Sequence, residues 1–191
     1  KKVNDDCSKP IAKDCSDARC KARRCVMVPF SPNSCVGCGG KTPHHPIPVG
    51  ELSESRKKGE ARGQSRYPKY SDGAAPCICV EGKDHDSRNP VSTELDEHGR
   101  VGAKFAQLRN DKLPKGTKLG AEYDFSIALD CGAQAVSSAT GCDEACVRKQ
   151  LEVAHEQMDV KPTDKAFKSK QKANVPLFKK PPIGAAPVAP Q

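Results

Sequence analysis

Eleven cysteines in a chain of 191 residues limit what this protein can fold into, because that number is far above ordinary usage. Hydrophobic residues make up 36% of the chain, aromatic residues only 4%, and there is no tryptophan. We therefore expect one modest core, held together by disulfides in an oxidising compartment, by structural metal, or by both. The odd count leaves at least one thiol outside any complete set of internal disulfides.

Lysine and arginine outnumber aspartate and glutamate by 32 to 24, which gives a formal net charge of +8. This balance favours an acidic partner or a polyanionic substrate, although a solvated basic surface would carry the same charge. No run approaches the length of a transmembrane helix and the N-terminus lacks a signal-peptide pattern, so no membrane insertion is expected. The start at Lys1, with no methionine, fits a piece excised from a longer protein.

Composition divides the chain into three parts. Residues 1–30 are polar and rich in cysteine, and they are expected to pack on the domain that follows. Residues 31–160 hold most of the apolar segments and should form the functional domain. Residues 161–191 are rich in lysine, proline and alanine and predict a basic, flexible tail. A basic arm that touches nucleic acid or a partner is the alternative for this last part.

Residues 35–50 place a thiol pair, Cys35 and Cys38, shortly before the adjacent histidines His44 and His45. Neighbouring side chains on an extended backbone point to opposite sides, so one imidazole can hold a metal while the other faces a water or a scissile bond. This arrangement suits metal-assisted hydrolysis. A pair of turn histidines flanked by prolines is the alternative that the doublet alone leaves open.

Two further segments are expected to support the histidine pair. Residues 74–82 have the β-branched, turn-bounded character of a short strand, which could pair with the strand that carries the histidines. Residues 92–108 have a helical pattern, with Ser92 or Thr93 as a suitable N-cap and an acidic first turn that suits the helix dipole.

Residues 143–158 predict the clearest helix, because an apolar stripe at helical spacing is surrounded by opposed charges. This helix should pack on the core, with Cys142 or Cys146 tied to an earlier cysteine. His155 lies among polar residues of the helix and is expected at the surface rather than as a ligand. Residues 123–129 are apolar, but whether they form strand or helix stays open.

Three segments together carry a family resemblance. Residues 42–48 read Thr-Pro-His-His-Pro-Ile-Pro, residues 75–82 read Ala-Pro-Cys-Ile-Cys-Val-Glu-Gly, and residues 98–100 read His-Gly-Arg. The series resembles the HNH and endonuclease VII superfamily of ββα-metal nucleases. More narrowly, it resembles the bacterial toxin nucleases with a paired-histidine signature, which are often the C-terminal domains of type VI secretion effectors. The resemblance covers residues 20–158.

The resemblance implies an α+β fold. A small cysteine-rich domain would be built around a ββα-metal (HNH-like) hairpin and helix, with additional helices and a disordered C-terminal tail. Residues 31–160 would then be the nuclease domain, and residues 1–30 would pack on it.

The resemblance also assigns roles to individual residues. His44 would bind the metal, and His45 would be the general base that polarises the attacking water. His98 would be a second ligand, supplied by the helix. Many relatives carry another histidine four residues further on, where this chain has Gly102. The expected partner of His98 is therefore Glu94, four residues before it on the same helical face.

Asn89, between the second strand and the helix, resembles the middle residue of the HNH name and would orient the base. The implied cofactor is a divalent metal, with Mg²⁺ expected first and Zn²⁺, Mn²⁺ or Ni²⁺ as alternatives. Such an ion would stabilise charge on the phosphate and the leaving oxygen.

Cys35 and Cys38, together with Cys77 and Cys79, could form a structural Zn²⁺ site of four thiolates that pins the two strands, as thiol pairs do in endonuclease VII relatives. The spacing in the second pair is shorter than in the usual zinc knuckle. The same four residues could instead join the other cysteines in disulfides, which would suit an effector that crosses an oxidising periplasm.

Residues 51–70 are strongly basic with few apolar anchors, and they predict an exposed loop. The loop could contact a phosphate backbone and stack on bases, or it could simply be solvated. The expected nucleic-acid contacts are Arg56, Lys57, Lys58, Arg62, Arg66 and Tyr67.

These observations lead to the hypothesis of an antibacterial toxin domain, a metal-dependent endonuclease that hydrolyses phosphodiester bonds of DNA. The expected partners are the DNA substrate, a cognate immunity protein, and secretion spike proteins bound through an N-terminal region absent from this sequence. The protein would be secreted and delivered into target bacterial cells. The alternatives are a nuclease acting on RNA and a non-catalytic, disulfide-stapled secreted binding module.

Overall fold

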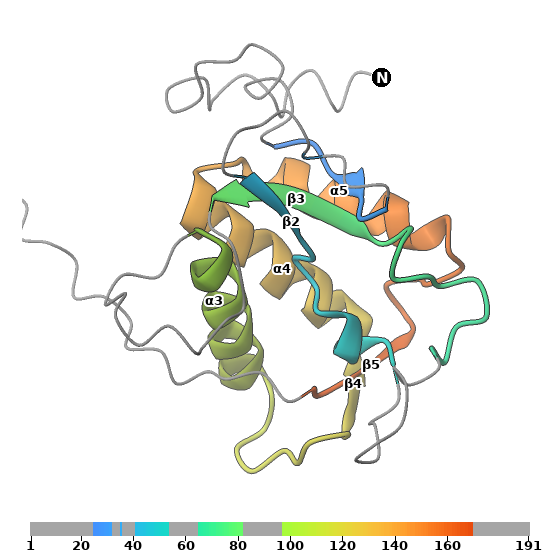
Figure 1. Ribbon diagram of the computed structural model, residues 1–191. Coiled ribbons are helices and arrows are strands. Elements are labelled where there is room, and N and C mark those ends of the chain that lie inside the picture. The colour runs from blue at the N-terminus through green and yellow to red at the C-terminus, as the bar shows by residue number, and fades with distance from the viewer. Residues whose placement is uncertain (1–24, 32–34, 36–40, 54–64, 82–96, 170–191) are drawn as a thin grey trace, which may run out of the picture.

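The computed structural model describes residues 25–31, 35, 41–53, 65–81 and 97–169 (Figure 1). In chain order the elements are β1 (Val28–Pro29), β2 (Lys41–His44), η2 (Val49–Glu51), β3 (Pro76–Glu81), α3 (Glu97–Lys112), β4 (Glu122–Asp124), α4 (Phe125–Thr140), α5 (Glu144–Glu156) and β5 (Lys165–Phe167). The fold is therefore α+β, as the sequence predicts. Within the described residues, no helix is both long and apolar enough to cross a bilayer.

The main sheet has the strand order β1-β3-β2, and both pairings are antiparallel. His44 of β2 lies opposite Ile78 of β3, so the predicted pairing between the histidine strand and the Cys-X-Cys strand is confirmed. The central strand β3 is buried on both faces, since Cys77, Ile78, Cys79 and Val80 are each at most 1% exposed. A strand buried on both sides provides a rigid base for the histidines next to it.

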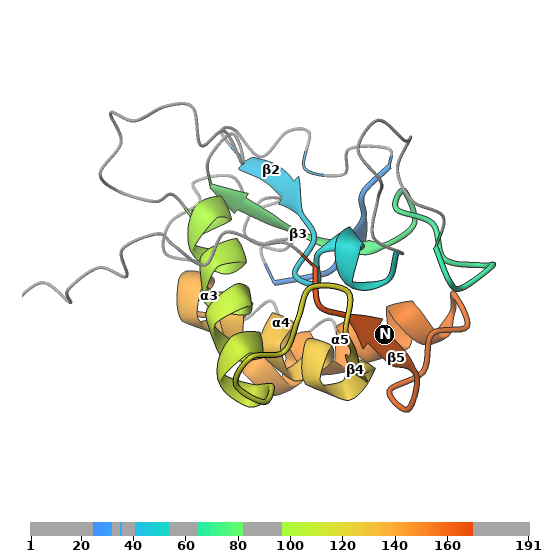
Figure 2. The same cartoon turned by 90° about the horizontal axis from the view of Figure 1, so that it is seen from below.

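The helices form a layer on one side of this sheet (Figures 1 and 2). The predicted helix at residues 143–158 is confirmed as α5, and the Asp143 side chain caps it by accepting from the backbone N–H of Cys146 at 2.8 Å. Helix α4 ends at Gly141, whose φ of 77° is the left-handed conformation that favours glycine. Within the described residues α3 runs to Lys112, four residues past the predicted end at residue 108.

The apolar segment at residues 123–129 divides between two elements. Its first residues belong to β4, and α4 begins at Phe125. β4 pairs antiparallel with β5, with Tyr123 opposite Ala166. This two-stranded sheet lies apart from the main sheet, at the end of the molecule where η2 is found (Figure 2).

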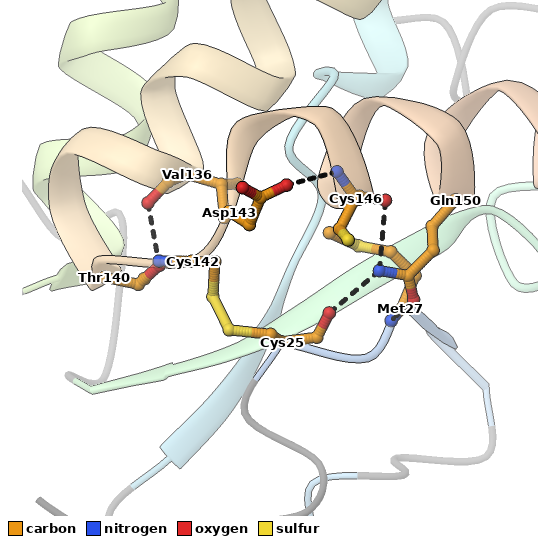
Figure 3. The surroundings of a disulfide bond; sticks show 8 residues. All are labelled: Cys25, Met27, Val136, Thr140, Cys142, Asp143, Cys146 and Gln150. Carbon is orange, nitrogen blue, oxygen red and sulfur yellow. Dashed lines mark hydrogen bonds between the residues drawn. A yellow bond between two sulfur atoms is a disulfide. The ribbon is translucent and has the colours of Figure 1, made fainter. Parts of the chain in front are cut away.

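One disulfide joins Cys25 to Cys142 across 117 residues, which confirms the predicted tie between Cys142 or Cys146 and an earlier cysteine. Figure 3 shows how the surroundings hold this link. The Gln150 side chain donates to the carbonyl of Cys25 at 2.9 Å and accepts from the backbone N–H of Met27, also at 2.9 Å. The segment before β1 is thereby attached to the α4–α5 junction and to α5 itself.

Two expectations differ from the structure. The tail predicted from residue 161 begins inside the fold, because Lys165–Phe167 is β5 and Ala166 is fully buried. His155, expected at the surface, is only 2% exposed, because Tyr70 and Phe125 pack against its ring. Both aromatic residues are distant in sequence, so the polar neighbours of His155 along the helix gave the wrong expectation.

Candidate functional site

The site is built where the end of β2 meets the first turn of α3. β2 ends at His44, and α3 carries His98 as its second residue. The two imidazoles meet edge to face, with ring centroids 4.2 Å apart. Both are largely buried, at 4% and 6% exposed. Two residues 54 positions apart in sequence (98 − 44) are therefore brought into direct contact by the packing of one strand on one helix.

The orientation of the His98 ring is fixed by β2. The Thr42 hydroxyl lies 3.1 Å from Nδ1 of His98. A hydroxyl can donate or accept, so this contact is compatible with either tautomer. Because Nδ1 is engaged in this way, a metal bound by His98 would be held through Nε2.

Gly102 lies one turn after His98 and faces the ring of His44. A Cβ built at Gly102 would lie 3.8 Å from Cε1 of His44, an ordinary contact distance. The helix position at which relatives carry a second histidine therefore does point toward His44 in this chain. Glycine supplies no donor there, but it leaves space beside the imidazole.

His45 points away from this pair, as expected for adjacent residues on an extended segment. Its ring stacks on Phe30 with centroids 4.8 Å apart and an interplanar angle of 24°. Its Nε2 lies 3.1 Å from the carbonyl oxygen of Asp72. A carbonyl can only accept, so this hydrogen bond requires the proton on Nε2 and leaves Nδ1 as the basic nitrogen. His45 is therefore held in one tautomer, with its proton on Nε2.

The loop after His45 is seated on the helix layer. Gly132 of α4 lies so close to it that a Cβ there would come within 3.0 Å of the Ile47 side chain and 3.4 Å of the Pro46 carbonyl oxygen. The two prolines at 46 and 48 further restrict this stretch of backbone. The histidine pair is thus carried on a stiff support.

His155 lies in the apolar layer behind the site. Burial and, to a smaller extent, the nearby His45 lower the pKa of His155 to about 4, although a hydrogen bond to the Leu151 carbonyl opposes the shift. Its Nδ1 donates to that carbonyl at 2.7 Å. His155 is consequently neutral at pH 7 and behaves as a core residue.

The fit of a divalent metal can be judged from the donors present. Imidazole nitrogen is a common metal ligand, and His44 with His98 offers two from facing elements. Among the residues that the structure describes, no group of three or more His, Cys, Asp or Glu side chains is placed to hold an ion. The pair therefore fits as part of a donor set, to be completed by water, substrate, or residues outside the described ranges.

The cysteines near the site do not form the four-thiolate zinc arrangement. Cys35 and Cys79 are joined in a disulfide, so these two sulfurs are not available as thiolate ligands. Cys77 is a buried free thiol, and burial raises its pKa. Cys38 lies outside the described residues. Cys79 sits opposite Pro43, so the disulfide attaches Cys35 beside the end of β2.

Several predicted site residues lie outside the described residues: Asn89, Glu94, Arg56, Lys57, Lys58 and Arg62. Arg66 and Tyr67 are described, and both are engaged within the protein. Arg66 forms an ion pair with Glu122 and lies over the ring of Phe167. Tyr67 donates to the carbonyl of Lys165 at 2.6 Å and accepts from its backbone N–H at 3.1 Å. These contacts attach the end of the basic segment to β4 and β5.

Sequence reasoning missed the groups that contact His45 and the ion pair that joins η2 to α3. Phe30 and the Asp72 carbonyl orient His45, and a buried pair, Glu51 and Arg109, joins η2 to α3. None of these residues belongs to a recognisable sequence motif. The one signal available was Phe30 itself, one of five phenylalanines in the chain and the end of the first apolar run.

Comparison with known proteins gives a family and a relative. Residues 41–155, more than half of the 191-residue chain, match the family described as GHH signature containing HNH/Endo VII superfamily nuclease toxin 2. The chain is also 29% identical over 146 residues to the DNase toxin Tse7 of Pseudomonas aeruginosa. That match covers 73% of this chain but 36% of the relative, so the chain spans little more than a third of its length. No solved structure gives a significant match.

Proposed function

Because the chain belongs to the GHH-signature nuclease toxins of the HNH/endonuclease VII superfamily, we propose that it is an antibacterial DNase that cuts phosphodiester bonds with His45 as general base. The observation that carries the proposal is that the adjacent residues His44 and His45 have separate surroundings. His44 joins His98 at a buried contact, while His45 turns to Phe30 and the Asp72 carbonyl. Separate places for ligand and base are what metal-assisted hydrolysis requires.

The proposed roles follow from the contacts. His44 and His98 would hold the divalent ion, and a bound ion would stabilise negative charge on the phosphate and the leaving oxygen. His45 would take the proton of the attacking water at Nδ1, since Nε2 donates to the Asp72 carbonyl. The β2–β3 pair followed by α3 would be the ββα unit of the superfamily. Asn89 is proposed to orient the base, and Glu94 is proposed as the third ligand of the metal.

The proposed ion is a divalent metal, with Mg²⁺ the first expectation from the resemblance. Two imidazole donors also suit Mn²⁺, Ni²⁺ or Zn²⁺, because nitrogen ligands favour the transition metals more than they favour Mg²⁺. A panel of these ions therefore belongs in any test of activity.

DNA is the proposed substrate because the similar protein from Pseudomonas aeruginosa is named a DNase toxin and the net charge of +8 favours a polyanion. Arg56, Lys57, Lys58 and Arg62 are proposed to contact the phosphate backbone. Tyr67 is a weaker candidate for base stacking, because its hydroxyl is held by Lys165. RNA is the second substrate to compare.

We extend the proposal to the biological setting of such toxins. The protein would be delivered into target bacterial cells through secretion spike proteins and would be neutralised by a cognate immunity protein. Charge complementarity predicts an acidic surface on that inhibitor. Family membership favours the nuclease over the non-catalytic binding module that the sequence alone left open.

The test is cleavage of plasmid DNA and of RNA by the purified protein, with chelator and with each divalent ion. His45→Ala should lower the rate about 100-fold or more, the usual contribution of a general base. Gln157→Ala, at the exposed C-terminal end of α5, is the matched control and should cut normally. Undiminished cutting by His45→Ala would remove His45 from the role of base. Cutting of RNA alone would replace the proposed substrate.

A further inference from the structure

A buried ion pair joins α3, the helix that carries His98, to η2, the short helix that follows the His44 strand. Glu51 is the last residue of η2, seven positions after His44, and Arg109 lies in α3, eleven positions after His98. The Arg109 guanidinium donates to the Glu51 carboxylate, and the two side chains are 2% and 0% exposed. The β2–η2 segment therefore has a second point of attachment to α3, remote from the histidines.

The carboxylate of Glu51 collects donors from three directions. The Tyr123 hydroxyl at β4 donates to one oxygen, and the Ser169 hydroxyl and backbone N–H donate to the other. Arg109 also donates to the carbonyl of Ser169 at 3.2 Å. Burial raises the pKa of Glu51, while Arg109 and the two hydroxyls oppose the shift. A fully buried guanidinium needs a compensating anion, and the Glu51 carboxylate lies beside it.

The close approach of Ser169 to η2 depends on Gly50. A Cβ at Gly50 would lie 2.9 Å from Cβ of Ser169, closer than such atoms approach one another. The segment after β5 is therefore seated directly on the turn that follows the histidine pair. This segment lies beyond residues 41–155, the part of the chain that matches the family.

Stability alone is a poor explanation for such a pair. Removing two charges from water is costly, and replacing a buried ion pair with apolar side chains of similar volume is often neutral or stabilising. What this pair adds is direction, because Nη1 of Arg109 donates to both the Glu51 carboxylate and the Ser169 carbonyl, while Glu51 also accepts from Tyr123 and Ser169. An ion pair with these contacts would fix the position of η2 along α3.

We propose that Glu51 and Arg109 are positioning residues, which set the register of the β2–η2 segment on α3 and so hold His44 against His98. This inference rests on the proposed nuclease function. It predicts that loss of the pair weakens metal binding and turnover more than it weakens DNA binding, because the pair acts on the relative position of two ligands. A displacement of about 1 Å at a reacting centre can cost roughly 100-fold in rate.

The main test is the double variant Glu51→Leu with Arg109→Met, an apolar replacement that leaves neither charge unpaired. Its kcat should fall about 10- to 100-fold while KM for plasmid DNA stays within about twofold of the wild type. Binding of Mn²⁺, followed by its electron paramagnetic resonance signal, should weaken about tenfold or more. Imidazole ¹⁵N signals of His44 and His98 should broaden or shift.

Two further variants keep the result interpretable. Arg109→Lys retains the charge but has one nitrogen in place of the guanidinium, which contacts Glu51, Ser169 and Asn110, so it should fall between the wild type and the double variant. Val160→Ala removes buried volume next to α5 and is the control for general destabilisation. It should leave kcat and Mn²⁺ affinity unchanged at temperatures where it is folded.

A folded double variant with wild-type kcat, Mn²⁺ affinity and histidine signals would overturn the positioning role and leave the nuclease function standing. If the wild type cuts neither DNA nor RNA, the proposed nuclease function fails separately. The Mn²⁺ and ¹⁵N measurements still decide whether the pair positions the two imidazoles. Equal losses of affinity in the double variant and Val160→Ala would also reject a specific role.

Discussion

At the scale of single residues, burial decides what each histidine can do. His44 and His98 are buried against each other, and His155 is buried among aromatic rings. His45 is only half-buried, and its ring contacts Phe30 and the Asp72 carbonyl. The four described histidines thus divide into a contacting pair, a half-buried residue that is the proposed base, and a core residue, although all four have the same side chain.

The buried state of His155 has a consequence for stability. Its pKa falls from 6.5 to about 4 in the folded protein, so protonation below pH 6.5 favours the unfolded chain. The stability it contributes is therefore complete above pH 6.5 and is lost as the pH falls towards 4. The shift corresponds to about 3 kcal/mol.

Denaturant unfolding of the wild type and of His155→Phe at pH 7 and pH 4 measures this effect. Other groups titrate in the same range, so the informative quantity is the difference between the two proteins. The stability lost by the wild type between these pH values should exceed the loss in His155→Phe by about 3 kcal/mol. Equal losses would show that His155 does not titrate differently on folding.

Replacement of two helix glycines by alanine should have opposite effects on the stability of the protein. A Cβ at Gly102 meets only His44, at 3.8 Å, so Gly102→Ala should gain about 1 kcal/mol from helix propensity. A Cβ at Gly132 would meet the Ile47 side chain at 3.0 Å and the Pro46 carbonyl at 3.4 Å. Gly132→Ala should therefore lose stability, because the loop after His45 must move.

Thermal unfolding of both alanine variants provides the measurement, and each glycine serves as the control for the other. A loss of stability in Gly102→Ala would mean that the space beside His44 is filled. A gain in Gly132→Ala would mean that the loop is not seated on α4 as described.

At the scale of elements, the histidine strand is fixed by a covalent link as well as by pairing. The Cys35–Cys79 disulfide closes a sequence separation of 44 residues beside the end of β2. Loop-closure entropy for that separation gives an upper value of about 4 kcal/mol. Cys77, two residues away on β3, is a buried thiol that is not part of this link.

The double variant Cys35→Ala with Cys79→Ala should therefore unfold at lower denaturant than the wild type, with a loss of about 2 to 4 kcal/mol. Cys77→Ala is the matched control from the same strand, and it should lose less. Reductant should destabilise the Cys77→Ala protein but have a smaller effect on the double variant. Equal sensitivity of the two variants to reductant would assign the link a minor role.

The elements also show what a sequence can predict. β3 was predictable as a short β-branched run bounded by turns, and α5 because its apolar residues recur at helix spacing. The contact of His44 with His98 was expected only through family resemblance. Asp72, Phe30 and the Glu51–Arg109 pair were not predictable, because each acts through a contact between segments that no local pattern records. β5 was hidden for a similar reason, since its three residues are held by backbone pairing within a lysine-rich sequence.

At the scale of the whole molecule, the C-terminal segment completes the fold around the site. The backbone N–H groups of Phe125 and Ser126, at the start of α4, donate to the carbonyls of Asp164 and Pro162 at 2.8 and 3.0 Å. β5 then pairs with β4, and Ser169 reaches Glu51. Residues 161–169 thus connect α4, β4 and η2, which are elements from the family-matched part of the chain.

A chain ending at Val160, where composition alone places the start of the tail, should therefore be much less stable than a chain ending at Ser169. The shorter chain loses β5, exposes the face of β4, and leaves the Glu51–Arg109 pair without the Ser169 contacts. Incompletely satisfied buried charges and the lost packing should together cost about 3 kcal/mol or more. Denaturant unfolding of the two truncated proteins gives the comparison directly. Because both lack residues 170–191, any difference belongs to residues 161–169, and equal stability would show that this segment only rests on the fold.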